Sequence, residues 1–600
     1  MQETFAHRQQ EFTQKQSEAQ SRYNRFAILR LGWFLLAALA VYLLFKQNET
    51  NIGLGVGVAG LIGFLVLLKM HQRIGRERDR FRWLAHLNAD EAARLERRFS
   101  RPETGQEFVE PEHPYAADLD VFGNHSLFRL LNRTHTHEGH RKLAAYLLYA
   151  APEAEIVLRQ AAATELRPQL DWRQDFEALA YLSPAVGQST KTLKIWAKTP
   201  TEEPVPAYLS LLRWLLPSLT LVLIGIWLNG QMPGWGVTTA LLIHAFVLSQ
   251  VAKQAKEISE QTYEISQSLR TYRDLLKHLA ALPVEAAILR RLHRRLETDK
   301  TTAADAIGQL GRLVENLNFR RNPYFFLFVG LISLWDLHYL SALERWKRRF
   351  GPHLADWLDV VAEWEALNSL AGFAYAHPAY ATPTVQEDGL RLAFTQARHP
   401  LLRPDRGVPN SLQLEGNGRT ILITGSNMSG KSTFLRTVAT NTVLALCGAV
   451  VAAERFACSP VQLFTSMRTQ DSLEESTSSF YAELKRLKAL IERTRQTSGI
   501  PVLYFLDEIL KGTNSADRHR GARALIMQLH GTTASGFVST HDVELGDLAE
   551  THPFIENYSF HSDVVDGQLH FDYTLQPGVC RSFNATQLMR SIGIEMGPET

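Results

Sequence analysis

A glycine-rich loop between residues 425 and 433 carries the clearest chemistry in the sequence. It follows an apolar strand predicted at residues 420–424 and precedes an apolar helix, the context that the phosphate-loop pattern Gly-x-x-x-x-Gly-Lys-Ser requires. Glycines let backbone N–H groups turn inward around a phosphate, and the helix N-terminus adds partial positive charge. We expect nine residues to bind the phosphates of ATP: Gly425, Ser426, Asn427, Met428, Ser429, Gly430, Lys431, Ser432 and Thr433.

Within and beyond this loop, particular side chains have distinct expected roles. Lys431 would contact the β- and γ-phosphates, and Ser432 would bind Mg²⁺. A second apolar strand, at residues 502–506, ends in two adjacent carboxylates. We predict that Asp507 is a second Mg²⁺ ligand and that Glu508 polarises the attacking water. This pair is a specific signal of such a site, because an ordinary surface pair of carboxylates would not follow directly after an apolar strand.

A third strand, predicted at residues 536–540, is followed directly by His541. This histidine would hydrogen-bond the γ-phosphate or the attacking water. A single histidine is more often structural, but its place after the third strand of this series favours the catalytic interpretation. We therefore expect Lys431, Glu508 and His541 to be the catalytic group, with ATP and Mg²⁺ as ligands.

The elements that position these residues belong to an α/β region. Short alternating strands begin near residue 381, whereas residues 83–205 and 252–320 show the spacing of packed helices. We predict α-helical membrane hairpins and a helical core and lever region, followed by a C-terminal α/β ATPase domain of the ABC type.

Four apolar runs are long enough to cross a membrane, which takes about 17–25 mostly apolar residues. They form two pairs with short polar links and cover residues 26–45, 52–68, 209–228 and 235–251. Basic residues flank the outer ends of the pairs, whereas the links contain only Lys46. The positive-inside rule therefore places four helices in the cell inner or plasma membrane, with both termini and the ATPase domain in the cytoplasm. The alternative is that the runs are buried helices of a soluble core.

A fifth apolar run, at residues 324–340, contains Asp336 and His338. A carboxylate in the middle of a membrane span costs roughly 2.5–3.5 kcal/mol. A fifth crossing would also place the ATPase domain outside the cell. We therefore expect this run to be a buried helix of the soluble body.

Composition adds limits on the function. The 64 basic and 62 acidic residues give a formal net charge of +2, which does not indicate a dedicated nucleic-acid binder, although a local basic face is compatible with it. Cys447, Cys458 and Cys580 show neither metal-binding spacing nor a disulfide framework. The polar N-terminus lacks the features of a cleavable signal.

We expect six segments along the chain. They are a polar N-terminal helix (1–25), a first transmembrane hairpin (26–69), a cytoplasmic helical core (70–208), a second transmembrane hairpin (209–251), cytoplasmic lever and core helices (252–380) and the ATPase domain (381–600).

Several motifs make the sequence resemble the MutS family of DNA mismatch-repair ATPases. The family's loop TGPNMGGKST corresponds to Thr424-Gly-Ser-Asn-Met-Ser-Gly-Lys-Ser-Thr433, and the Asn-Met pair is a trait of this family. Arg398-His-Pro400 matches the family's RHP, and residues 507–513 match its DEIGRGT. The resemblance is strong over residues 380–590 and weaker in the helical core.

The resemblance implies that two ATPase domains pair, and therefore a homodimer. Ser478 lies in a segment similar to the family's STF element and would reach the γ-phosphate bound by the partner subunit. Thr513 and Asp517 would lie in a loop at the dimer interface. ATP binding would close the pair and move the long helices.

The sequence also departs from the family pattern. Ser426 and Ser429 replace a proline and a glycine of the phosphate loop, and apolar hairpins occupy the region of the family's mismatch-reading domain. Phe108-Val-Glu110 matches the family's Phe-x-Glu wedge in form, but it lies in a proline-rich loop, and we interpret the match as coincidence. The pattern indicates a membrane-anchored MutS-related branch that lacks the mismatch-recognition domain.

Three functions are compatible with these features. The chain could be a membrane-tethered ATP-dependent clamp for DNA, an ATP-driven switch or scaffold for a protein partner without DNA binding, or a transporter. The lack of an LSGGQ sequence and the few polar residues in the apolar runs rank the transporter last. The core and lever helices favour DNA, whereas the near-neutral charge favours a protein partner. The expected partners are a second copy, membrane lipid, and either DNA or a protein.

Overall fold

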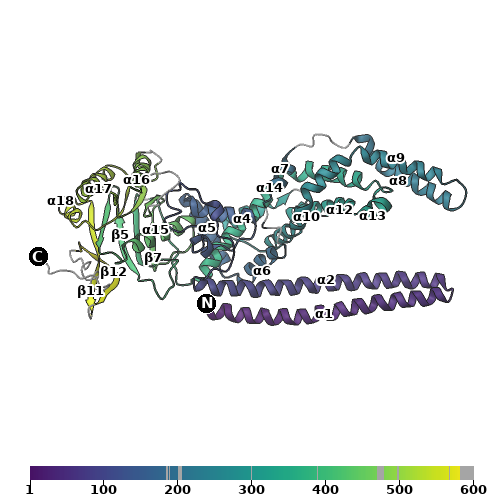
Figure 1. Cartoon of the computed structure of the whole chain (residues 1–600), viewed down its shortest axis with the longest axis horizontal. Helices are drawn as coiled ribbons and strands as arrows, with labels where there is room; N and C mark the ends of the chain where they lie inside the picture. Colours follow the sequence, from purple (N-terminus) through teal and green to yellow (C-terminus); the bar gives the residue numbers. More distant parts are fainter. Residues whose placement is uncertain are drawn as a thin grey trace.

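The computed structural model describes residues 1–183, 187, 189–199, 206–298, 301–387, 389–468, 479–495, 499–565 and 568–580. The molecule is long, with a domain of strands and helices at one end and two helical hairpins that extend from a helical body toward the other end (Figure 1). The predicted order, a mostly helical region followed by an α/β domain, is confirmed.

The first hairpin consists of α1 (Gln2–Lys46) and α2 (Thr50–Leu95), which are 45 and 46 residues long. Small residues let the two helices approach closely, because a Cβ atom at Gly60 would lie 2.7 Å from that of Ala37. The polar ends of the hairpin pack on the helical body through a small apolar cluster. The part near the connecting turn instead exposes apolar side chains, and Ile28 is 72% exposed.

The second hairpin consists of α8 (Ala207–Leu228) and α9 (Trp235–Ser249). After a bend of 57°, the chain continues into α10 (Ala252–Ala280) of the helical body. The outer surface of this second hairpin is also apolar, and Leu221 is 61% exposed. By length and composition, three helices of the described part are suited to cross a membrane, or up to five if each of two bent helix pairs counts as one.

The helical body packs around α14 (Trp335–Ala376), a helix of 42 residues that runs from the second hairpin toward the α/β domain (Figure 1). Trp346, Trp357 and Trp364 of this helix are buried. The other elements of the body are η1 (Gln106–Phe108), α3 (Leu127–Leu131), α4 (His137–Leu148), α5 (Glu153–Leu166), α6 (Leu170–Tyr181), α7 (Lys191–Lys198), α11 (Ala287–Arg295), β1 (Glu297–Thr298), β2 (Thr301–Thr302) and α12 (Ala303–Asn318). A single helix thus connects the hairpin end of the body with the α/β end.

The fifth apolar run is not one buried helix, so this prediction is wrong. It follows η3 (Phe319–Arg321) and is divided among α13 (Pro323–Phe325), the π-helix η4 (Phe326–Gly330) and the start of α14, with a 91° bend before α14. Leu334 allows the bend because its φ of 51° is incompatible with helix continuation. The sequence did not reveal this break, since neither glycine nor proline occupies position 334.

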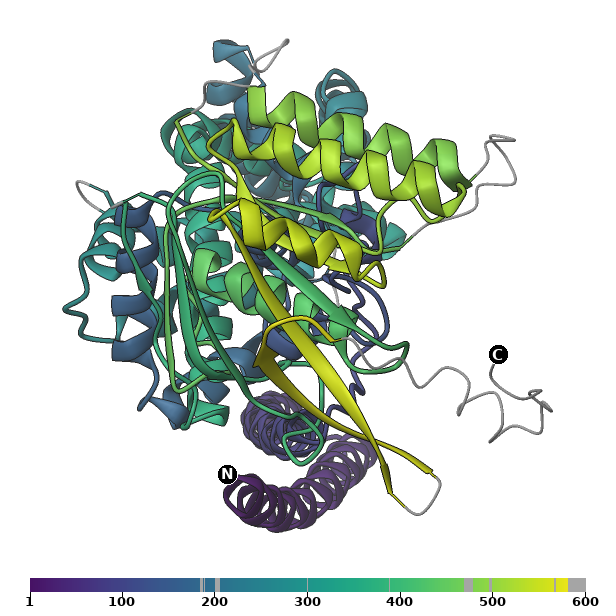
Figure 2. The ribbon, with the colours of Figure 1, turned by 90° about the vertical axis from the view of Figure 1, so that its left-hand side faces the viewer.

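The α/β domain contains a six-stranded sheet of order β12-β11-β6-β10-β9-β8, and all neighbours are parallel except β11 and β12. Figure 2 views the molecule from this domain, with β11 and β12 in front. A four-stranded sheet has the order β3-β7-β4-β5. The strands are β3 (Thr384–Val385), β4 (Arg391–Ala397), β5 (Asn410–Glu415), β6 (Thr420–Gly425), β7 (Arg455–Cys458), β8 (Gln462–Ser466), β9 (Val502–Asp507), β10 (Ser535–Thr540), β11 (Ile555–Val565) and β12 (Gln568–Pro577). The helices are α15 (Lys431–Cys447), α16 (Ser479–Arg495), α17 (Ser515–His530), η5 (Glu544–Asp547) and α18 (Leu548–Thr551).

Candidate active site

Three neighbouring parallel strands bring the predicted site residues to one edge of the large sheet. β10 lies between β6 and β9, and its residues Ser539 and Thr540 pair in register with Asp507 and Thr424. Because parallel strands end at the same edge, the phosphate loop, the acidic pair and His541 follow adjacent strand ends. This edge is where open parallel sheets bind ligands.

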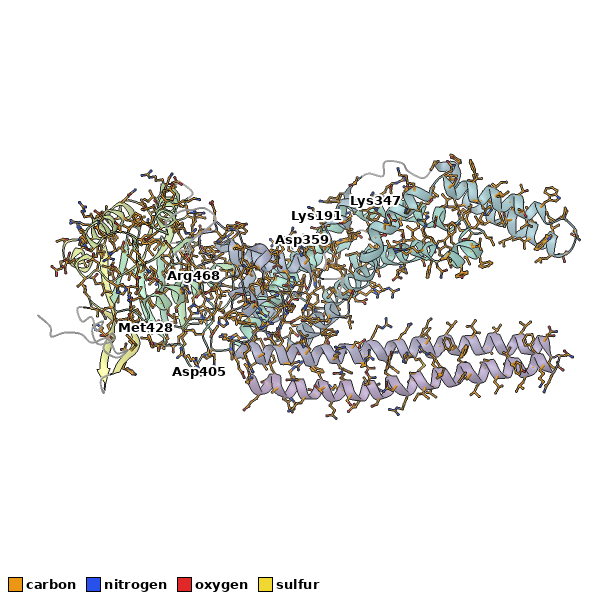
Figure 3. The ribbon with its side chains drawn as sticks, viewed as in Figure 1. Lys191, Lys347, Asp359, Asp405, Met428 and Arg468 are labelled. Carbon is orange, nitrogen blue, oxygen red and sulfur yellow. The ribbon has the colours of Figure 1, made fainter. Side chains whose placement is uncertain are left out.

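The phosphate loop turns tightly between β6 and α15. Gly430 is the N-cap of α15 and has a φ of +104°, a conformation that favours glycine. Gly425 is equally constrained, since a Cβ atom there would lie 2.8 Å from the Ser429 hydroxyl and 2.9 Å from the Phe560 carbonyl. Met428 is 72% exposed at the surface of the domain (Figure 3). The two glycines therefore set the shape of the loop.

Lys431 lies inside this loop and is almost completely buried. Its ammonium donates hydrogen bonds of 2.9 Å to the carbonyls of Gly425 and Ser426. Burial lowers the pKa of Lys431, and the nearby carboxylates oppose that shift. With two donors bonded to the loop, the third N–H of the ammonium can bond a ligand oxygen.

Two buried hydroxyls in the loop support the binding of a polar ligand. Ser426 and Ser429 have hydroxyl oxygens that are buried without a hydrogen-bond partner among the described residues. A buried hydroxyl without a partner is costly, and the oxygens of a phosphate would accept hydrogen bonds from both. Asn427 and Thr433 are exposed and, with Ser432, line a cleft that opens beside the loop. The donors of the loop therefore fit a phosphate group.

Glu508 is held by two basic side chains. Its carboxylate is 2.6 Å from Nε2 of His541 and 2.8 Å from Nζ of Lys511. The hydrogen bond from His541 is the main cause that lowers the pKa of Glu508 to about 2. Its backbone is also constrained, with a φ of 50° and an N–H bonded to the Ser539 carbonyl at 3.1 Å. Glu508 is thus a fixed, ionised group at the end of β9.

Asp507 and Ser432 provide the oxygen ligands that Mg²⁺ prefers. Asp507 accepts a hydrogen bond from the Ser539 hydroxyl, which orients its carboxylate at the strand end. Ser432 lies in the first turn of α15, beside Lys431. A carboxylate and a hydroxyl next to a phosphate site form the donor set typical of magnesium in this kind of loop.

A cleft of about 560 Å³ opens beside the loop. The sequence did not predict the side chains on the far wall of this cleft. They come from the loop before β5 and from β11 and β12. They include Leu402, Val408, Phe560 and Tyr573. Tyr573 is 43% exposed, and a Cβ atom at Gly430 would lie 3.0 Å from its ring. The apolar and aromatic wall next to a phosphate site fits a flat base.

His399, the histidine of the Arg-His-Pro motif, lines the same cleft. Burial, with a smaller contribution from Arg436, lowers the pKa of His399 to about 4. Its Nδ1 accepts a hydrogen bond from the backbone N–H of Leu401 at 3.2 Å. The ring is therefore neutral at physiological pH and contributes shape instead of charge.

The helical body contacts the α/β domain next to the site, a junction that the sequence did not indicate. Asp118 is buried and accepts hydrogen bonds from the Thr465 hydroxyl at 2.6 Å and from the backbone N–H of Met467 and Arg468 at 3.1 and 3.0 Å. Asp120 forms two 2.9 Å bonds with Arg468, which lies where the domain meets the body (Figure 3). These contacts position the end of β8.

The remaining predicted residues lie elsewhere. Thr513 precedes α17, and Asp517 lies in its first turn, where its backbone N–H donates a hydrogen bond of 2.9 Å to the side chain of the N-cap residue Asn514. Ser478 lies outside the described residues, so its predicted contact with a partner subunit stays a prediction. Phe108 packs near Phe122 in the helical body.

Comparison with known proteins identifies the α/β domain. Residues 421–595 match MutS domain V. The DNA mismatch repair protein MutS of Natronomonas pharaonis is 33% identical over 239 residues, which are 39% of this chain and 27% of that protein. The corresponding protein of Desulfatibacillum aliphaticivorans is 32% identical over 253 residues, or 41% of this chain and 27% of that protein. The Endonuclease MutS2 of Geobacillus kaustophilus is 31% identical over 239 residues, or 38% of this chain and 30% of that protein. The chain spans less than a third of the length of each of these relatives, and the part that it shares with them is a domain similar to domain V of the MutS family.

Proposed function

We propose that the chain is a membrane-anchored ATPase of the MutS family that hydrolyses ATP to ADP and phosphate. The convergence of Lys431, Asp507, Glu508 and His541 at one sheet edge, next to a cleft suited to a nucleotide, carries this proposal. The match of this region to MutS domain V supports it.

In this proposal, the chain's own residues divide the work. Lys431 and the N–H groups at the start of α15 bind phosphate oxygens, and Tyr573 packs against the base. Asp507 and Ser432 would hold Mg²⁺, which when bound would neutralise phosphate charge. Glu508 orients the attacking water. His541 keeps the Glu508 carboxylate ionised and directed toward the cleft. A second subunit completes the site with the segment that contains Ser478.

The two hairpins would anchor this ATPase in a membrane. Both extend from the helical body on the side away from the α/β domain (Figure 1). Their outer surfaces expose large apolar side chains such as Leu221 and Phe246, which water solvates poorly. By the positive-inside rule, the basic residues at their inner ends support a cytoplasmic ATPase domain. The proposal therefore has four crossings in the inner or plasma membrane.

ATP binding would close a clamp formed by two copies, and we infer that its ligand is DNA. The long helix α14 connects the hairpin end to the α/β domain and can transmit such a movement. The names of the relatives, DNA mismatch repair proteins, favour a nucleic-acid ligand. The near-neutral charge of the chain favours the second candidate, a switch that holds a protein partner at the membrane.

DNA binding by the full-length protein in lipid nanodiscs separates the two candidates. Fluorescence anisotropy of a labelled duplex should show binding at about 50 mM salt that weakens steeply toward 200 mM, because phosphate contacts release counterions. The affinity should also change when ATP is added. Absence of binding at low salt, with ATPase activity intact, would leave the protein-partner switch as the function.

A further inference from the structure

A further exposed apolar surface of the described residues lies in the segment 323–334, called the bent segment below. Asn322 caps its start by accepting hydrogen bonds from the N–H groups of Tyr324 and Phe325 at 3.0 and 3.2 Å. α13 and η4 then contribute three and five residues, or about 12 Å of helix at 1.5 Å per residue. This length is far below the roughly 30 Å of a bilayer core, so the segment cannot cross.

One face of the bent segment is apolar and exposed. Tyr324 is 75% exposed, Phe328 68%, Leu327 57% and Val329 41%. Four neighbouring large apolar side chains in water are unfavourable, and such patches usually mark a contact with a partner or a membrane.

The other face holds the segment firmly in place. The ring of Phe325 meets that of Trp335 at 4.9 Å, and the Trp335 indole donates to the Asn316 carbonyl at 2.6 Å. Asp336, the carboxylate that opposed membrane insertion, is buried and paired with Arg320 at 3.0 Å. The acidic group is therefore enclosed by protein, so insertion of the segment does not transfer this carboxylate into lipid.

The bent segment is also bonded to the second hairpin. Nδ1 of His244 in α9 lies 2.9 Å from the Leu331 carbonyl, and Nε2 lies 3.0 Å from the Thr220 hydroxyl in α8. A carbonyl only accepts, so Nδ1 carries the proton and Nε2 accepts from Thr220. Figure 1 shows α13 beside the hairpin. The bent segment therefore adjoins the second hairpin.

We propose that the bent segment inserts its exposed face into the cytoplasmic leaflet of the bilayer without crossing it. The partner is lipid, because this face adjoins the apolar hairpin proposed above to lie in the membrane and because the nearby Asp336 is paired with Arg320. This inference rests on the proposed membrane anchoring. It places the start of α14, which reaches the α/β domain, directly after the inserted segment.

Depth-dependent fluorescence quenching tests the insertion. Full-length protein in vesicles would carry an environment-sensitive fluorophore on a single introduced cysteine, and the lipids would carry nitroxides on their acyl chains. The native Cys447, Cys458 and Cys580 are buried and should react slowly. Phe328→Cys is the test, Leu221→Cys in α8 is the membrane control, and Val157→Cys, 50% exposed in α5, is the aqueous control. Leu327→Cys replaces the test variant if Phe328→Cys does not fold.

Insertion predicts that the label at position 328 shows at least half the quenching found at position 221, with none at 157. Quenching at 221 but not at 328 would overturn the insertion and leave the anchoring intact. A label at 328 that is shielded from an aqueous quencher but not quenched by lipid would show that protein covers the segment, which also overturns it. No quenching at 221 would refute the anchoring itself.

Discussion

At the scale of single residues, the site depends on how neighbouring groups change ordinary side chains. Glu508 would be a typical carboxylate on a surface, but its bonds to His541 and Lys511 lower its pKa to about 2. Its charge is therefore constant between pH 5 and 8. Each carboxylate oxygen keeps a further lone pair beside its present partner, so Glu508 can accept a hydrogen bond from the attacking water while His541 and Lys511 stay bound.

The tyrosine at the cleft wall provides a first prediction. Tyr573→Ala removes the aromatic face beside the phosphate loop and should raise the KM for ATP about tenfold, since base stacking on an aromatic ring is worth about 1–3 kcal/mol. Tyr573→Phe keeps the ring and should bind ATP like the unmodified protein. Steady-state ATPase kinetics measure both, and an equal loss in the two variants would contradict the stacking role.

A buried carboxyl of α14 provides a second prediction, on stability. Glu365 accepts hydrogen bonds from the backbone N–H groups of His135 and Thr136 at 2.8 and 3.2 Å. Burial raises its pKa from 4.5 to about 7. The folded protein therefore holds more protons than the unfolded chain between these values, so stability falls as the pH rises from 4.5 through 7. Above pH 7 the cost reaches up to about 3 kcal/mol.

Glu365→Gln removes this ionisation and should raise the thermal unfolding midpoint at pH 8 while changing it little at pH 5. Glu363→Gln, two residues earlier and paired with Lys142, is the matched control. The midpoint of the control should not rise at pH 8. A shift for Glu365→Gln that is the same at both pH values would show that ionisation of this group is not responsible.

Most of the site residues could be predicted from the sequence, but the side chains that surround them could not. A strand, a glycine-rich loop and a helix are local in sequence, and the acidic pair and His541 each close an apolar strand. Tyr573 and Asp118 have no such local pattern, because they reach the site only through the packing of β12 and of the helical body. Local motifs indicate which residues bind phosphate, whereas the cleft wall depends on the tertiary fold.

At the scale of elements, the junction between the helical body and β8 couples the two halves of the protein. Asp118 bonds Thr465 in β8 and Met467 just after it, before the segment that contains Ser478 in the sequence. Asp118→Asn replaces a carboxylate oxygen by an amide group that cannot accept from a backbone N–H. We expect kcat to fall about five- to tenfold with little change in the KM for ATP, and stability to fall by about 1–3 kcal/mol.

Asp405→Asn is the control for this substitution, since Asp405 pairs with Arg403 on the exposed surface of the same domain (Figure 3). Exposed ion pairs contribute little, so both kcat and stability should stay unchanged. If Asp118→Asn changed KM and kcat equally, or changed neither, the junction would not position the end of β8 for catalysis.

Helix and strand types followed from periodicity, because apolar spacing reports which face of an element is buried. The bend at Leu334 did not follow, since a leucine with positive φ has no marker in the sequence. Composition alone also could not separate a buried helix from an exposed apolar one. The fifth run shows this directly, because its acidic residue is hidden against Arg320 while its apolar side chains face outward.

At the scale of the whole molecule, the protein separates an ATPase end from an apolar end. The α/β domain and the hairpins lie at opposite ends of a helical body, and α14 runs between them (Figure 1). In the proposed function, nucleotide-dependent closure at one end changes the helical body and its contact with lipid at the other.

The central claim is that Glu508 activates water at an ATP site, and one substitution tests it most directly. Full-length protein in nanodiscs would be assayed for phosphate release and for retained nucleotide, with and without Glu508→Gln. We predict at least a 100-fold loss of turnover, within the range of about 10²–10⁴ typical for a general base. ATP should stay bound and unhydrolysed, whereas Lys431→Ala should lose the nucleotide. Turnover by Glu508→Gln at the rate of the unmodified protein would contradict the account.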